Sequence, residues 1–231
     1  MSIKSYVKER HTKRELLLEI KKMIIEESSH KMKTFEILNV NTVDEVMRQF
    51  INIGNMSYFC GDNDVFEYFI ESLFDIVNAE PNGIDSEELI KRIYHYSLMS
   101  AKNYDLIAYS VILNNIKKNI LKLTEAQPVN QYLMILKDLA AISVSNNLKA
   151  GIMEALHAFR GINDHFVDNK MQINRMYLKN IIISIVYSAE KSRHEKLKDI
   201  LLAESSEILG FPNPQDQPIT HFTGTAPSSK K

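Results

Sequence analysis

The sequence predicts an all-α protein, either a right-handed α-solenoid or a helical bundle, with about four antiparallel helix pairs and an N-terminal capping helix. Apolar residues recur at helical spacing in segment after segment of the chain. These segments repeat about every 43 residues, a period typical of paired-helix repeats. The only two prolines before residue 210, Pro81 and Pro128, fall at junctions of this repeat. These three observations predict the fold class.

Residues 128–166 show the pattern most clearly. One apolar stripe runs through residues 132–140 and a second through residues 148–159. Ser145, Asn146 and Asn147 lie between them, and such side chains compete with helical backbone bonding and favour turns. Two helices joined so closely must lie nearly antiparallel. The stretch is therefore predicted to be a helical hairpin.

The same hairpin pattern divides the chain into four units, at about residues 42–84, 85–127, 128–171 and 172–210. Proline lacks an N–H and fixes its own φ, so Pro81 and Pro128 suit positions where one helix ends and another begins. The third junction, at residues 169–172, has no proline and rests on periodicity alone. In the fourth unit the stripe expected to be buried is Met176, Tyr177, Ile181, Ile182, Ile185 and Val186.

This repeat resembles the HEAT-like helical repeats as a structural class. The resemblance covers roughly residues 42–209 and carries no functional residues. It implies that the second helices of the units, at about 64–79, 104–122, 147–162 and 193–208, line one continuous face suited to an extended partner.

The two ends of the chain read differently from the repeat. A helical stripe that begins at Leu16 predicts an N-terminal helix that covers the end of the stack, and residues 35–40 are expected to be a connector. Residues 1–210 are thus predicted to be one domain. Residues 211–231 hold four of the six prolines and no helical period, which predicts an extended or disordered tail.

Composition narrows the class of protein. The net charge of −1 gives no bias towards nucleic acid or an anionic membrane, and the most apolar run, residues 180–187, is too short to span a bilayer. The single cysteine, Cys60, excludes an intrachain disulfide and fits a reducing compartment. We expect a cytoplasmic protein without membrane insertion, with Cys60 as a small core residue.

The first unit has an unusual charge distribution, because residues 49–90 contain no Lys or Arg. Acidic residues spaced by three or four share one helix face there, where like charges repel one another. Either Lys and Arg of neighbouring segments neutralise this face, or it binds a basic peptide or a second subunit. The candidate residues are Asp64, Glu67, Glu71 and Asp75.

The second-helix face supplies four further candidates, chosen by geometry alone: Asn114, Lys118, Glu154 and His157. Glu154 and His157, like Glu27 and His30, have the i, i+3 spacing of di-iron sites, which also need two inward Glu residues from other helices. Glu154 and His157 are expected on a solvated polar face instead.

Other chemistry-bearing patterns are weaker. Asp164, His165 and Asp168 could form a metal or acid–base cluster, but Asn163 and Asp164 are expected to end a helix. The chain has no glycine-rich phosphate loop, Cys-x-x-Cys, His-Glu-x-x-His or Gly-x-Ser-x-Gly motif. The sequence therefore predicts no catalytic residue, metal site or cofactor.

The function that we predict is a non-enzymatic protein–protein interaction scaffold. Its candidate partners are a protein or basic peptide, or a second copy of the chain in a homo-oligomer. One alternative is a DNA-binding protein similar to the HEAT-like alkylpurine glycosylases. Those enzymes are expected to be basic and to use Trp, whereas this chain has no Trp, so nucleic acid is not the expected partner. The other alternative is a metal-binding or small-ligand-binding helical bundle that uses Glu154 and His157.

Overall fold

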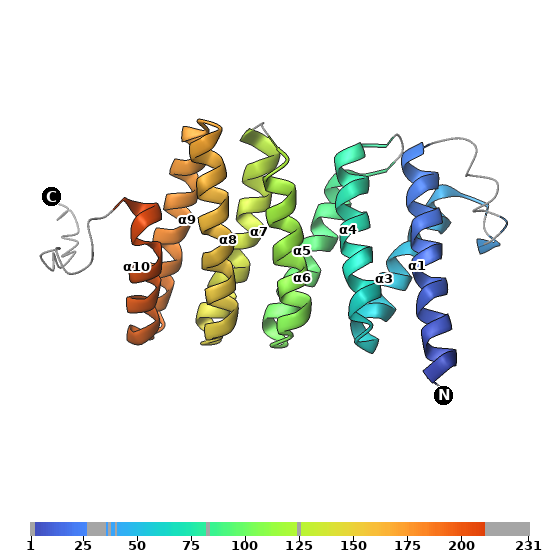
Figure 1. Cartoon of the computed structure of the whole chain (residues 1–231), viewed down its shortest axis with the longest axis horizontal. Coiled ribbons are helices and arrows are strands. Elements are labelled where there is room, and N and C mark those ends of the chain that lie inside the picture. The colour runs from blue at the N-terminus through green and yellow to red at the C-terminus, as the bar shows by residue number, and fades with distance from the viewer. Residues whose placement is uncertain are drawn as a thin grey trace, which may run out of the picture.

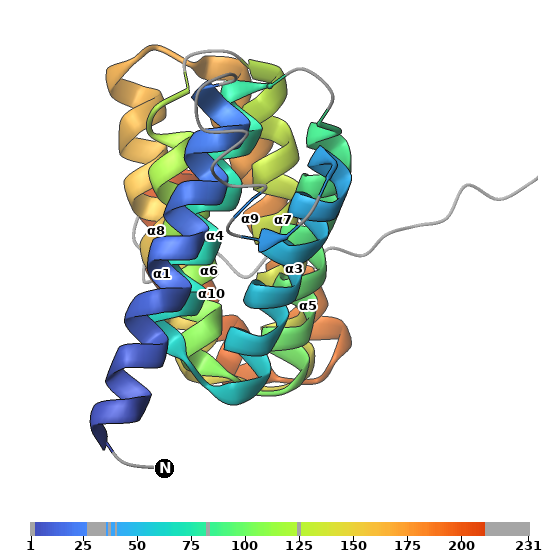
Figure 2. The same ribbon diagram turned by 90° about the vertical axis from the view of Figure 1, so that its right-hand side faces the viewer.

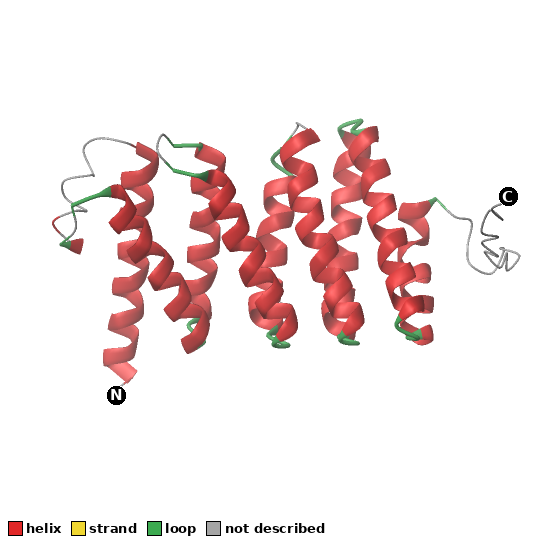
Figure 3. Cartoon of the chain, turned by 180° about the vertical axis from the view of Figure 1, so that it is seen from behind, coloured by secondary structure: helices red, strands yellow, loops and turns green. Residues whose placement is uncertain are grey.

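The computed structural model describes residues 3–26, 36, 38–39, 41–81, 84–123 and 126–210, with the backbone alone for 3–11 and 126–128. Nine helices and no strand occur among these residues (Figures 1 and 3). The prediction of an all-α fold is therefore confirmed. The helices are α1 (Ile3–Glu26), α3 (Val43–Cys60), α4 (Asn63–Ala79), α5 (Ser86–Lys102), α6 (Leu106–Ile120), α7 (Ala126–Ser145), α8 (Lys149–Asp168), α9 (Gln172–Lys191) and α10 (Glu195–Leu209).

The helices stack in two layers. Figure 2 looks along the stack and shows α3, α5, α7 and α9 on one side and α1, α4, α6, α8 and α10 on the other. Each first helix packs against the second helix that follows it in sequence, as α3 does against α4. The second helices also pack against one another in order, α4 on α6, α6 on α8 and α8 on α10. The predicted continuous row of second helices is thus confirmed, and α1 extends it by packing against α4.

Local sequence signals explain where several helices begin and end. Thr42 and Glu45 form a reciprocal capping box at the start of α3, which satisfies backbone N–H groups that have no partner within the helix. The side chains of Asp85 and Asp105 accept hydrogen bonds from backbone N–H groups at the starts of α5 and α6, without the reciprocal bond. At the end of α3, Gly61 adopts φ 68°, a left-handed conformation that glycine reaches without strain.

An apolar core runs between the layers. Its most aromatic part joins the first two units, where the Phe50 and Phe69 ring centroids are 4.9 Å apart and those of Phe66 and Tyr96 are 5.6 Å apart. Gly54 lies in the middle of α3, and a Cβ there would be 2.3 Å from the Phe69 ring. The glycine thus lets the ring approach the α3 backbone closely.

Polar side chains link neighbouring units at intervals close to the repeat period. Tyr96 Oη donates a hydrogen bond to Asn55 Oδ1 over 2.6 Å and 41 residues of sequence. Arg160 Nη2 donates to Glu204 Oε2 over 3.2 Å and 44 residues. These bonds join adjacent units and help to fix how one unit sits on the next.

Two local predictions are wrong. Asn163 and Asp164 do not end a helix, since α8 continues to Asp168. The helix continues because Ile162 and Phe166, four residues apart, both face the core. Cys60 is exposed rather than buried, because it is the last residue of α3 and lies next to the α3–α4 turn. Residues 27–30, 35, 37, 40 and 211–231, and the side chains of residues 3–11, lie outside the described part of the chain, so their predictions stay predictions.

Candidate functional site

The four acidic candidates of the first unit lie on α4, between two helices that carry basic residues. Lys21 of α1 donates a hydrogen bond to Asp75 Oδ2 over 2.9 Å. On the other side, Lys118 of α6 donates to Glu71 Oε1 over 3.0 Å. Neighbouring helices therefore neutralise Glu71 and Asp75, which was one of the two alternatives open from the sequence.

The two remaining acidic candidates, Asp64 and Glu67, are exposed near the start of α4. Close to them, the buried carboxylate of Asp62 accepts a hydrogen bond from Lys13 of α1 at 3.2 Å. The acidic face is thus broken up by Lys13, Lys21 and Lys118.

The candidates on α6 and α8 do not come together as one site. Asn114 and His157 are exposed, and Lys118 is already paired with Glu71. Glu154 is half-buried and accepts a hydrogen bond from Ser110 Oγ of α6, so it joins α8 to the preceding unit. Within the described residues, no three His, Cys, Asp or Glu side chains are grouped as metal ligands.

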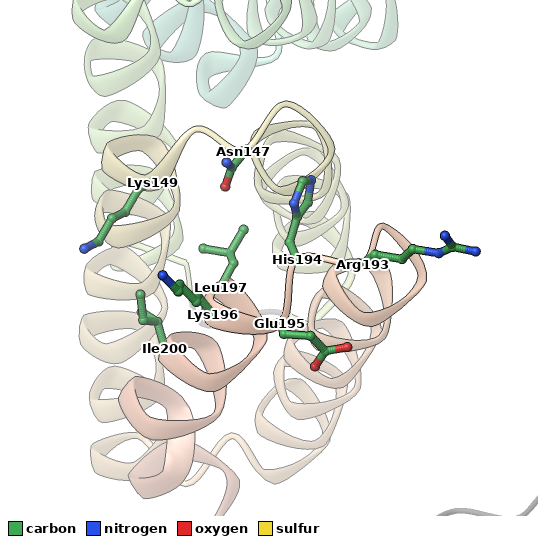
Figure 4. Close-up of a pocket in the computed structure, with 8 residues that line it drawn as sticks. All are labelled: Asn147, Lys149, Arg193, His194, Glu195, Lys196, Leu197 and Ile200. Atoms are coloured by element: carbon green, nitrogen blue, oxygen red, sulfur yellow. The ribbon is translucent and has the colours of Figure 1, made fainter.

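A cavity of about 540 Å³ lies between the α7–α8 turn and the α9–α10 turn (Figure 4). Its charged groups do not converge, because Arg193 points away from it and Lys149 and Lys196 point to one side. Leu197 is buried and Ile200 is half-buried in its wall. The other lining residues are Asn147, His194 and Glu195. This cavity is an open groove without an arrangement for acid–base or nucleophilic chemistry.

The outward face of α9 carries large apolar side chains in contact with solvent. The exposed fractions are 74% for Ile173, 65% for Met176, 50% for Ile183 and 65% for Tyr187. Together with the exposed Asn180 between them, these residues are spaced by three, four, three and four. We call these five residues the α9 stripe. This is the spacing of the a and d positions with which one helix packs along another.

The opposite face of α9 is buried in the stack. Leu178, Ile182 and Ile185 are at most 2% exposed. Helices α7, α8 and α10 pack against α9, while among the described residues the α9 stripe stays exposed. Large contiguous apolar patches are uncommon on the surfaces of monomeric proteins, so the α9 stripe is the candidate site that we consider further.

The sequence interpretation missed the α9 stripe. It assigned Met176 to the buried side, which is wrong. The useful signal was that Ile173, Ile183 and Tyr187 form a second apolar row opposite Ile181 and Ile185. Periodicity revealed one row, and the second row was not recognised as separate from it.

Comparison of the chain with protein-family models, curated proteins and solved structures gives no match. In the part of the chain that the structure describes, no helix combines the length and apolar character needed to cross a bilayer.

Proposed function

We propose that the protein is a non-enzymatic protein–protein interaction scaffold of the HEAT-like helical-repeat type, and that the α9 stripe is its main docking surface. The observation that carries this proposal is the exposure of four large apolar side chains on a single helix, between 50% and 74%. The occupant that fits them is an amphipathic helix with its own apolar row at a and d spacing.

The expected affinity follows from the size of the stripe. Full burial of an aliphatic or aromatic side chain contributes about 1.5–3 kcal/mol. The four apolar side chains of the α9 stripe are already partly buried, so each would contribute only a part of this free energy on binding. Association costs roughly 4–15 kcal/mol in lost freedom of motion. The stripe therefore supports reversible binding that stays sensitive to the loss of a single contact.

A basic-peptide dock on α4 has less support. A basic peptide would compete with Lys118 for Glu71 and with Lys21 for Asp75, both held within 3.0 Å. Exposed ion pairs contribute about 0–1 kcal/mol each, so the exchange gives little net attraction. Glu67, which is exposed on α4, remains the better-placed acidic residue for such a contact.

The test begins with a photo-crosslinking amino acid at Ile183 of α9, or at His95 of α5 as a control, in the cells that make this protein. We expect adducts at position 183 and none at position 95. The partner is identified from the adduct, purified separately and titrated by calorimetry against the wild type and the Met176→Lys/Ile183→Lys variant. Apolar contacts are lost in this variant, so we expect affinity to fall at least tenfold, about 1.4 kcal/mol.

A matched control adds the same charge elsewhere. The Gln49→Lys/His95→Lys variant changes exposed residues of α3 and α5 and should bind as the wild type does. Equal adducts at positions 95 and 183, or unchanged affinity of the α9 variant, would contradict the proposal.

A further inference from the structure

We propose that the α9 stripe packs against the α9 stripe of a second copy of this chain, in an antiparallel pair with a two-fold axis close to Asn180. This inference rests on the proposed function, because it names the partner of the same face. It makes α9 both the docking surface and the amphipathic helix that the surface recognises.

The order of side chains along the stripe is close to symmetric. Seen from Asn180, apolar residues lie seven and four positions before it and three and seven positions after it. A two-fold interface uses the same surface on both copies, so it must be self-complementary. An antiparallel pair brings Ile173 near Tyr187 of the second copy and Met176 near its Ile183, apolar against apolar at both ends.

Asn180 suits the centre of such a pair. A side-chain amide both donates and accepts hydrogen bonds, so two copies of Asn180 near the axis can bond to each other. A single Asn within an apolar seam fixes the register and number of the helices that pack there. A stripe of Ile and Met alone would allow several registers.

The charges at the two ends of α9 are compatible with the antiparallel direction, because Glu190 and the basic Lys191 of the last turn offset each other. The first turn of α9 has no acidic residue, and Met171 before it makes no side-chain cap, so its N–H groups present positive potential. In an antiparallel pair, Glu190 lies near the first turn of the other α9. Glu190 pairs with Lys198 at 3.0 Å, yet its side chain stays 54% exposed. A parallel pair would instead place the Glu190 side chains of the two copies near each other.

The area of the surface sets the strength of the dimer. A helix of 20 residues is about 30 Å long and roughly 10 Å wide, so α9 offers a footprint of roughly 300 Å². The outward face of α7 lies beside it, includes Met134 at 39% exposure and extends this footprint. Stable interfaces bury about 800 Å² of accessible surface on each partner. We therefore expect a dimer that dissociates on dilution.

Cysteine cross-linking tests both the contact and its direction. Cys60 is exposed, so it is first replaced by Ser, and Asn180→Cys, Ile173→Cys or, as a control on α5, His95→Cys is then added. With a short bismaleimide we expect a covalent dimer at position 180, of twice 26.6 kDa. Position 173 should stay monomeric, because antiparallel copies separate it from its equivalent by roughly 20 Å.

Light scattering over a concentration series provides the second measurement. The wild-type mass should rise from 26.6 kDa towards twice that value, while the Met176→Lys/Ile183→Lys variant stays at the monomer mass. Cross-linking at both 173 and 180 would show a parallel pair and overturn the antiparallel geometry. No cross-link at 180 with a constant monomer mass would overturn the dimer. In that case the proposed function still stands if the Met176→Lys/Ile183→Lys variant no longer binds the protein that was captured at position 183. If the variant still binds that protein, the proposed function is contradicted as well.

Discussion

Helices α5 and α9 occupy the same layer of the stack, but their outward faces differ. Both bury an apolar row against the second layer, with Ile93 and Tyr96 of α5 and Leu178 and Ile185 of α9 at most 2% exposed. On the outward side, α5 carries two ion pairs, Lys91–Glu87 at 2.9 Å and Arg92–Glu88 at 3.2 Å. On the same side, α9 carries the apolar α9 stripe.

The difference shows which side chains of these helices the stacked fold constrains and which it does not. Stacking uses the inner rows and the flanks of these helices, which pack against the second layer and against α7. The i, i+4 pairs of α5 contribute a few tenths of a kcal/mol each and keep that face solvated. On α9 the corresponding positions carry apolar side chains that are 50–74% exposed, and the proposed contact with a second protein surface would bury them.

The largest expected effect compares two adjacent residues of α9. Ile182 is 1% exposed and Ile183 is 50% exposed. Ile182→Ala should lower the free energy of unfolding by about 2–5 kcal/mol, because it leaves a cavity in the core. Ile183→Ala should change it by less than about 0.5 kcal/mol. Urea unfolding at low protein concentration measures both, and equal losses would mean that α9 has no free outward face.

Alkaline pH probes the buried side of α5. Burial raises the pKa of Tyr96 to about 12 from 10.0. Between these values the unfolded chain loses the proton and the folded protein keeps it, so stability should fall as pH rises from 10 to 12, by about 1–3 kcal/mol. Urea unfolding across this range should show a shallower fall for Tyr96→Phe. A slope identical to the wild type would contradict this origin, and Tyr104→Phe, at an exposed tyrosine, controls for the loss of a phenol.

Two helical glycines differ in how closely another side chain packs against the helix backbone at their position. Gly54→Ala should destabilise the protein by about 1–3 kcal/mol, because its Cβ would meet the Phe69 ring at 2.3 Å. At Gly161 the added Cβ would meet only the end of the Lys117 side chain, at 2.8 Å, which can move away. Gly161→Ala should therefore be neutral or stabilising by up to about 1 kcal/mol. Thermal unfolding of both variants checks this, and a stable Gly54→Ala protein would contradict the close packing of α3 on α4.

The smallest effect concerns the ion pair between α4 and α6. Lys118→Ala should lower the free energy of unfolding by less than about 1 kcal/mol, because both partners are partly exposed. High salt should remove most of the difference from the wild type. Urea unfolding at two ionic strengths measures it, and a loss of several kcal/mol would show that the pair is part of the core.

Much of the fold was predictable from local signals. Apolar periodicity and the caps at Thr42, Asp85 and Asp105 indicate where helices begin, and they do not depend on distant residues. Longer-range features were not predictable. The partners of Glu71 and Asp75 come from 47 and 54 residues away, and only the stacking of helices brings them together. For the same reason, the sequence could not show which of the two apolar rows of α9 the neighbouring helices cover.

Methyl-detected NMR tests most directly whether the outward face of α9 is the contact surface. The methyl groups of Ile173, Met176 and Ile183 report on α9, and that of Met99, half-buried on α5, reports on the comparison helix. Spectra are recorded as the protein is concentrated, and again with the protein that cross-links at position 183. We expect chemical-shift changes and line broadening at the α9 methyls while Met99 stays unchanged. Equal changes on both helices, or none on α9, would contradict the proposal that α9 is the docking surface.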